Sequence, residues 1–321
     1  MNTIETFHEI VAKNLTLLCP VDEIWQPTDY LPDLTSEDWH DQLLSFRDAA
    51  QGLPDDLLIV LVGNMITEEA LPNYAISLEQ VMHDPTGTGD TPWAQWLRGW
   101  TAEENRHGDL LNAYLRLTGR VDMRAVEVTI HHLICNGFTS SNRGDVCAGL
   151  IYTAFQERAT RISHGNLAAR AAGHGEKSLA KICRKIAADE TRHEIFYTKL
   201  VNEMFDRDPE TAVLTYRQML RGLIAMPGRL MADGQNPNLF DQYSAVTLRT
   251  GVYTTRDYAS IIRHLNNAWN LEGRSVSGKA AKAQEYLCRQ PERYETLASE
   301  TEERVAEQPP VHFSWLPKQA V

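Results

Sequence analysis

The sequence predicts an all-α protein built from long helices. Apolar residues recur at spacings of three and four over four long stretches, which is the pattern of helices that bury one face. Segments dense in glycine, proline and other turn formers separate them, such as DPTGTGDTP at 84–92 and GHGE at 173–176. No stretch shows the clear alternation of apolar and polar residues that is typical of strands, so we expect helices throughout.

The four long helices are expected at 55–83, 92–117, 145–172 and 177–205. The first follows Pro54 and begins with two acidic residues, which favour a helix start. A helix of about 28 residues is about 42 Å long at about 1.5 Å per residue, which is the scale of a large four-helix bundle. Further helices are expected at roughly 209–224, 239–249, 255–271 and 276–305, interrupted near Pro227 and Gly234.

The chain has 321 residues, which is long for an average domain, but no linker divides the helical pattern. We therefore expect one domain over residues 1–321, with bundle helices at about 55–205 and accessory helices at about 209–305. The formal net charge of −12 argues against nucleic acid and anionic membranes as general partners, because both bind basic surfaces.

Apolar runs are short. The longest, LLIVLV at 57–62, is about a third of the roughly 18 residues that span a bilayer, so no membrane span is expected. The first residues show neither a basic region nor a long apolar core, so we expect no export signal. The 5 cysteines form no CxxC pair, as expected for reduced thiols. Together these features predict a cytoplasmic protein.

An acidic motif occurs twice, on the second and on the fourth expected long helix. TAEENRHGDLL at 101–111 aligns with AADETRHE at 187–194, and both contain acid, Glu, any residue, Arg, His. The motif places Glu104 with His107 in the first copy and Glu190 with His193 in the second. Residues three apart share one helical face, so each copy presents a carboxylate beside an imidazole. One such pair is common on a solvated face, whereas a doubled pair indicates two similar halves.

Each motif has a glutamate upstream on the preceding expected helix. Glu157 interrupts the apolar pattern of the third helix, 33 residues before Glu190. In the first helix Glu68 and Glu69 both interrupt it, and Glu68 lies 36 residues before Glu104. Spacing alone does not choose between these two neighbours, which could instead flank a kink near the proline that follows.

Four helices that each carry a glutamate, with a histidine one turn after two of them, provide the ligands of a ferritin-like, carboxylate-bridged dinuclear centre. Two Fe²⁺ ions and four carboxylates sum to zero charge, so such a centre can lie inside an apolar bundle. Without metal, four adjacent carboxylates would repel one another and take up protons. Oxygen and nitrogen ligands favour iron or manganese over a metal that is bound by thiolates.

Each ligating histidine is expected to donate its second ring N–H to a carboxylate that orients the ring. Glu103 and Asp189, which directly precede the motif glutamates, are the available groups. Both could instead be ordinary charges on a helix surface.

Longer segments around these residues carry a family resemblance: WQPTDYLPD, LVGNMITEEALPNY, WTAEENRHGDLLNAYLRLTGRVDM, YTAFQERATRISHGN, IAADETRHEIFYTKLV, NLFDQYSAVTLRTGVYTTRDY and FSW. Over about residues 21–316 the chain resembles the soluble acyl-acyl carrier protein desaturases, the family of the plastid stearoyl desaturases. The resemblance implies a ferritin-like bundle, and it selects Glu68 rather than Glu69. The diiron ligands that it implies are Glu68, Glu104, His107, Glu157, Glu190 and His193.

The resemblance also implies roles for residues around the metals. It places Thr160 one turn after a ligand, on the side where oxygen binds, and Trp100 one turn before another ligand. It implies an electron path from the surface through Trp25 and Asp189 to His107. The threonine could instead bond its own helix backbone, and the two tryptophans could be plain core residues.

The activity that the resemblance implies is insertion of a cis double bond into a saturated acyl chain on acyl carrier protein. Stearoyl or palmitoyl chains, delta-9 regiochemistry, O2, two Fe²⁺ ions, electrons from a ferredoxin and a homodimer belong to that expectation. One alternative is a diiron hydroxylase that acts on the same carrier. Another is a ferritin-like iron oxidase or storage protein, which needs no substrate tunnel and usually has a shorter chain.

Two further segments bear on the substrate. CNGFTSSNRGDVCAGL at 135–150 departs from the plant pattern, with Cys147 and Ala148 where the family usually has other residues, and this affects chain length and double-bond position. Acyl carrier proteins are acidic, as this chain is, so docking requires a local basic surface. YRQMLRGLIAMPGRLM at 216–231 has no acidic residue, and we expect docking at Arg217, Arg221 and Arg229.

Overall fold

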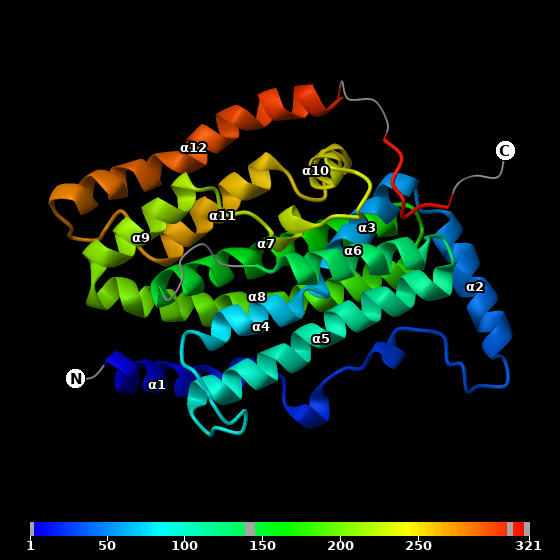
Figure 1. The fold of residues 1–321 in the computed structure, drawn as a ribbon, viewed down its shortest axis with the longest axis horizontal. Coiled ribbons are helices and arrows are strands. Elements are labelled where there is room, and N and C mark those ends of the chain that lie inside the picture. Colours follow the sequence, from blue (N-terminus) through cyan, green and yellow to red (C-terminus); the bar gives the residue numbers. More distant parts are fainter. Residues whose placement is uncertain (1–2, 139–144, 307–310, 318–321) are drawn as a thin grey trace.

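The computed structural model describes residues 3–138, 145–306 and 311–317, and over these ranges the chain is all-α, without strands (Figure 1). Four helices form the bundle, namely α3 (Asp55–Glu68), α5 (Pro92–Thr118), α7 (Val146–Gly173) and α8 (Lys177–Arg207). The other α-helices are α1 (Thr3–Asn14), α2 (Trp39–Gln51), α4 (Leu71–Glu79), α6 (Met123–Asn136), α9 (Pro209–Arg221), α10 (Leu239–Thr250), α11 (Thr255–Ala268) and α12 (Gly278–Ala306). Short 3₁₀ helices lie at Leu15–Leu17, Val21–Glu23, Pro27–Asp29 and Pro227–Leu230.

Capping residues define the ends of the bundle helices. Thr91 accepts a hydrogen bond from the backbone N–H of Ala94 at the start of α5, and Asp145 accepts one from Ala148 at the start of α7. Helix α5 ends at Gly119, whose φ of 66° is the left-handed conformation that favours glycine. The predicted starts and ends of these two helices are confirmed to within one residue.

The predicted first helix, 55–83, is wrong in length, because the structure divides it into α3 and α4. Pro72, in the first turn of α4, has no N–H, and in a continuous helix its ring would clash with the carbonyl of Glu68. The N–H of Ala70 bonds instead to the carbonyl of Thr67 at 3.2 Å, which is a tighter turn than the α-helical one. Glu68 is therefore the last residue of α3.

Three described helices, α1, α2 and α6, lie outside the predicted set. Helix α2 buries only Phe46 and Ala50, so it contributes little to the core. Helix α6 buries Val126, Ile130 and Leu133 at helical spacing, so its pattern is visible in the sequence. They pack outside the bundle, α1 against α5 and α8, α2 against α5, and α6 against α3.

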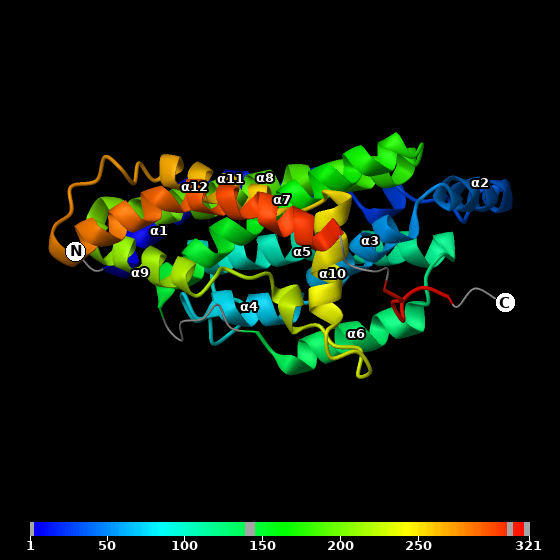
Figure 2. The same cartoon turned by 90° about the horizontal axis from the view of Figure 1, so that it is seen from above.

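The predicted C-terminal helices are confirmed as α9 to α12, and three of them cover one side of the bundle (Figures 1 and 2). Helix α12 packs along α11 and α9, which in turn pack on α7 and α8. Helix α10 runs across the others and contacts α3. That contact is close because Gly63 has no side chain, and a Cβ atom there would lie 2.0 Å from Tyr243 Cε2.

Helix α3 lies in the middle of this arrangement. Every residue from Leu57 to Glu68 is buried, since α5, α6, α7 and α10 all pack against the helix. Among the described residues, no single helix is long and apolar enough to cross a membrane. One pair, α2 with residues 55–79, meets those criteria only when both are taken together, and it is bent by 112°.

Two apolar clusters fill the bundle and leave a polar boundary between them. One cluster includes Leu110 of α5 and Ile186 of α8, and the other includes Trp100 of α5 and Phe196 of α8. Both copies of the acidic motif lie along their helices between these residues. The fold therefore places the motif side chains deep inside the chain, at the point where apolar packing is interrupted.

Candidate metal centre

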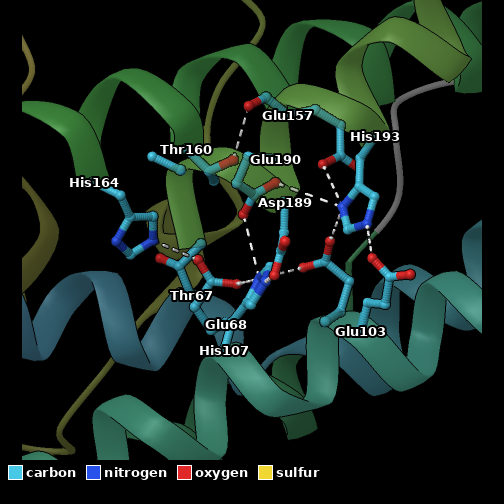
Figure 3. Close-up of polar contacts among 12 residues, drawn as sticks. Thr67, Glu68, Glu103, His107, Glu157, Thr160, His164, Asp189, Glu190 and His193 are labelled. Atoms are coloured by element: carbon cyan, nitrogen blue, oxygen red, sulfur yellow. Dashed lines mark hydrogen bonds and ion pairs between the residues drawn. The ribbon is translucent and has the colours of Figure 1, made fainter. Parts of the chain in front are cut away.

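Six side chains from the four bundle helices meet in the interior (Figure 3). Each is at most 7% exposed. They form two overlapping groups, and within each group one possible ligand atom per residue lies within 4.8 Å of the others. The first metal position comprises Glu68, Glu104, His107 and Glu190, and the second comprises Glu104, Glu157, Glu190 and His193. Glu104 and Glu190 belong to both positions, as bridging carboxylates would.

Orientation distinguishes Glu68 from its neighbour Glu69. Glu68 points into the cluster, with its Oε2 3.8 Å from His107 Nδ1. The carboxylate of Glu69 lies outside, where its Oε1 accepts a hydrogen bond from Asn112 Nδ2 at 3.2 Å. Sequence spacing left the choice between Glu68 and Glu69 open. Of the two, Glu68, which the resemblance implied, is the one that points into the cluster.

The donor atoms of the cluster fit metal ions. Five buried atoms of the cluster make no hydrogen bond among the described residues, namely Nδ1 and Nε2 of His107, Nδ1 of His193, Oε1 of Glu104 and Oε1 of Glu190, although His193 Nδ1 and Glu104 Oε1 lie 2.7 Å apart. Buried polar atoms normally have partners, because an unpaired one costs about 1–3 kcal/mol. Unpaired oxygen and nitrogen atoms that converge in this way fit cations, and four carboxylates balance the charge of two divalent ions.

The carboxylates of the cluster titrate apart because their surroundings differ. Burial alone would raise the pKa of Glu104, but the neighbouring charges of His107 and His193 outweigh it and lower this pKa to about 2. Burial together with the charges of Glu104 and Glu157 raises the pKa of Glu190 well above its usual value. Without metal these carboxylates therefore differ in their affinity for protons, and bound metal ions would compete with protons for them.

The expected orienting carboxylates lie crosswise. Asp189 Oδ2 is 3.5 Å from His107 Nε2, and Glu103 Oε2 is 3.1 Å from His193 Nε2 (Figure 3). Each acid thus contacts the histidine of the other motif copy. Arg192 joins the two acids, because its Nη1 lies 2.7 Å from Asp189 Oδ1 while its Nη2 donates to Glu103.

The three residues of the expected electron path are in contact. Trp25 donates its indole N–H to Asp189 Oδ2 at 2.6 Å. Its ring is parallel to that of His107, with 6.2 Å between ring centroids. Lys185 lies 3.1 Å from the other Asp189 oxygen and 5.9 Å from the centroid of the Trp25 ring.

Trp100 and Thr160 both lie beside the cluster. Trp100 donates its indole N–H to Glu157 Oε1 at 3.0 Å, so it contacts a candidate ligand in addition to packing in the core. The hydroxyl of Thr160 bonds to the carbonyls of Gln156 and Glu157 at 3.2 and 3.0 Å, which is the backbone bonding considered as its alternative role. Thr160 nevertheless lines the two cavities described below.

His164 lies outside the predicted set but contacts the cluster. Its Nε2 is 2.9 Å from Glu68 Oε1, and its side chain is 1% exposed. It follows Glu157 by seven residues, two turns along the same face of α7, and this spacing is a signal that the sequence carries. The motif repeat cannot find it, because the position equivalent to it after Glu68 lies beyond the end of α3.

Two cavities meet at the cluster. The larger, about 420 Å³, passes Ser163 and Tyr243, and the smaller, about 40 Å³, is bounded by Phe138 and Tyr152. Segment 135–150, which differs from the plant pattern, contributes Phe138 to the wall of the smaller cavity. Its Cys147 and Ala148 line neither cavity. Residues 139–144 of this segment lie outside the described residues. The residues common to both cavities are Thr67, Glu68 and Thr160.

A four-helix bundle around four buried carboxylates and two histidines defines the class of ferritin-like di-metal proteins. Within that class, the family model for fatty acid desaturase matches residues 1–317, and the chain belongs to that family. The family match confirms the expected family and an oxidoreductase that desaturates fatty acyl chains, and the helices of the described residues confirm the expected all-α bundle.

Similar proteins agree with this assignment. The chain is 48% identical over 320 residues to a chloroplastic acyl-[acyl-carrier-protein] desaturase of Cucumis sativus, covering 98% of this chain and 81% of that protein. It is 50% identical over 305 residues to the chloroplastic stearoyl-[acyl-carrier-protein] 9-desaturase of Ricinus communis, covering 94% and 77%. The X-ray structure of DesA2 from Mycobacterium tuberculosis shares the fold, with a TM-score of 0.53, 23% identity and coverage of 87% and 97%.

Proposed function

We propose that this protein inserts a cis double bond into a saturated fatty acyl chain that is bound to acyl carrier protein. Stearoyl or palmitoyl chains are the proposed substrates, and delta-9 is the proposed position. Two adjacent C–H bonds are broken, and O2, two electrons and two protons complete the balance as two molecules of water. The observation that carries the proposal is the buried set of four carboxylates and two histidines beside two cavities that share lining residues.

The proposed cofactor is a pair of carboxylate-bridged Fe²⁺ ions. Glu68, Glu104, His107 and Glu190 would hold one, and Glu104, Glu157, Glu190 and His193 would hold the other. An unactivated C–H bond has no accessible pKa, so acid–base side chains cannot break it, and the iron pair supplies the oxidising chemistry when bound. The protein's own residues exclude bulk water, fix the ligands and place the acyl chain beside them.

We propose that the acyl chain runs through the larger cavity, past Glu68 and Thr160, and ends in the smaller one. The two cavities share these residues, which lie at the cluster. The apolar end of the chain would contact Phe138 and Tyr152, whose rings have centroids 5.2 Å apart. This geometry would bring the carbons next to Glu68 within reach of the metals.

Electrons would come from a ferredoxin along the contacts from Trp25 through Asp189 to His107. Lys185 and Lys181 lie at the outer end of this path, where Lys181 lies 4.7 Å from the centroid of the Tyr30 ring. An acidic electron donor would match these cations. Further parts of the proposal are a single domain over residues 1–321, a cytoplasmic location and a homodimer, whose light-scattering mass would be twice 36.3 kDa.

Product analysis tests the proposed reaction. The iron-loaded protein is reduced without oxygen and then given O2 and stearoyl carrier protein, and the released fatty acids are measured by mass spectrometry. The expected product has lost two hydrogens. Cleavage at its double bond should give the fragments of a delta-9 fatty acid. A product that has instead gained one oxygen would support a hydroxylase, and iron oxidation with unchanged stearate would support a ferritin-like oxidase.

A further inference from the structure

Of the four glutamates in the cluster, Glu68 and Glu157 lie outside the repeated motif. One carboxylate oxygen of each is in contact with a ring nitrogen of another side chain. Trp100 holds Glu157 through its indole N–H at 3.0 Å, and His164 contacts Glu68 through Nε2 at 2.9 Å. The two donors come from different helices, α5 and α7, and neither belongs to the six proposed ligands. The two halves of the centre thus have analogous supports made from different residues.

The contact of His164 fixes its hydrogen position. A carboxylate oxygen only accepts hydrogen bonds, so Nε2 of His164 carries the hydrogen that is donated to Glu68 Oε1. The other oxygen of Glu68, Oε2, lies on the cluster side, 3.8 Å from His107 Nδ1 (Figure 3). The carboxylate therefore has one oxygen occupied by a protein donor and one oxygen directed to the first metal position.

Burial makes this support specific. Glu68 is 6% exposed and His164 is 1% exposed, and both line the larger cavity, so cavity water could fill the place of a lost donor but would not fix the carboxylate as a side chain does. Glu68 is also the last residue of α3, next to the break before α4, so backbone on one side only restrains it. A side chain from another helix is then needed to fix the direction of the carboxylate.

We propose that His164 is a positioning residue for the first metal position, where it holds Glu68 in the orientation that binds metal, as Trp100 does for Glu157 at the second position. The inference rests on the proposed di-metal function and deepens it. Hydrogen-bond donors around metal ligands commonly change metal affinity by about 10- to 100-fold. The two positions should therefore respond separately to loss of their two donors.

The test uses Co²⁺ titration of the metal-free full chain, with visible absorption and bound-metal stoichiometry as readouts. His164→Phe keeps a ring but removes the donor, and His164→Gln keeps an N–H donor. We expect the parent to bind two Co²⁺ ions. His164→Phe should bind one of them about tenfold more weakly, and His164→Gln should restore most of that loss.

Trp100→Phe is the matched control for the second position, because it also keeps a ring and removes one N–H. Trp100→Phe should weaken the binding of one Co²⁺ ion by a similar factor, with a different change in the absorption spectrum. The double variant should weaken the binding of both ions. Circular dichroism melting checks that each variant is folded. Two unchanged affinities in folded His164→Phe, or equal losses in His164→Phe and His164→Gln, would overturn the inference. A parent chain that binds no Co²⁺ would instead reject the proposed di-metal function as well.

Discussion

At the scale of single residues, Glu104 connects most of the centre. It belongs to both metal positions, with His193 Nδ1 2.7 Å from its Oε1 and His107 Nδ1 3.4 Å from its Oε2. These two imidazoles are also the reason that its pKa lies at about 2 in spite of burial. Removal of this carboxylate would leave both histidines facing an unbalanced set of charges, so both positions depend on it.

Replacement of single ligands should therefore remove metal without unfolding the bundle. Glu104→Ala and His193→Ala are expected to lose bound iron and desaturase activity and to keep the helical circular dichroism of the parent. Glu69→Ala is the control, since this neighbouring carboxylate lies outside the cluster. Iron content by metal analysis is the measurement, and full iron in either ligand variant would contradict the proposed site.

The doubled motif predicted Glu104 and His107 on α5 and Glu190 and His193 on α8, because a spacing of three residues between Glu and His can be read from the sequence alone. Glu157 followed from the same repeat, whereas the choice of Glu68 required the family resemblance, since only the end of α3 decides which neighbour points inward. His164 could not be found from the repeat, because its contact depends on how α7 crosses α3. Local spacing thus predicts ligands, and packing between helices determines what supports them.

At the scale of helices, a buried ion cluster joins α7, α8 and α11. Glu194 of α8 is 3% exposed and accepts two bonds from Arg158 Nη1 of α7, at 3.0 and 3.1 Å. His264 Nε2 of α11 lies 2.7 Å from the same carboxylate. Burial alone would raise the pKa of Glu194, but these partners lower it overall. The accessory helix α11 is thereby tied to the bundle.

Glu194→Gln should reveal this tie through pH. Because the folded pKa of Glu194 is below its usual 4.5, the stabilisation is present above that value and is lost as pH falls through the folded pKa. At pH 7 the free energy of unfolding, measured by urea denaturation, should be about 2 kcal/mol lower in the variant than in the parent. The difference should shrink in acid. Glu203→Gln, which removes a half-exposed pair with Arg207 on α8, is the control and should cost under about 0.5 kcal/mol.

The crossing of α10 over α3 depends on one glycine. A Cβ atom at Gly63 would lie 2.0 Å from Tyr243, whose hydroxyl bonds to Asn64 at 3.2 Å in the wall of the larger cavity. Gly63→Ala should therefore displace α10 and lower the free energy of unfolding by about 1–3 kcal/mol. Gly165→Ala in α7 has open space and should raise it by about 0.5–1 kcal/mol. Equal effects in urea denaturation would contradict the close contact.

At the scale of the whole molecule, charge opposes the proposed encounter. The chain carries −12, and an acidic carrier would be repelled unless a local basic surface faced it. Arg221 and Arg229 are exposed, and the described part of the chain contains no ion pair for either. Arg217 differs, because it is half-buried and its guanidinium lies 5.7 Å from the centroid of the Tyr286 ring. Its replacement would disturb packing as well as charge.

The last prediction therefore uses the two exposed arginines. Arg229 lines the larger cavity, and Arg221, the last residue of α9, borders a separate surface depression. Both could therefore contact the carrier as its acyl chain enters the larger cavity. Arg221→Glu with Arg229→Glu should raise the KM for acyl carrier substrate about tenfold at low salt and remove most of its salt dependence. Iron content and kcat should change little, since neither residue contacts the cluster. Arg124→Glu with Arg184→Glu reverses the same number of exposed charges on α6 and α8 and should leave KM unchanged. If both double variants shift KM equally, the effect is one of net charge, and the carrier docks on another surface.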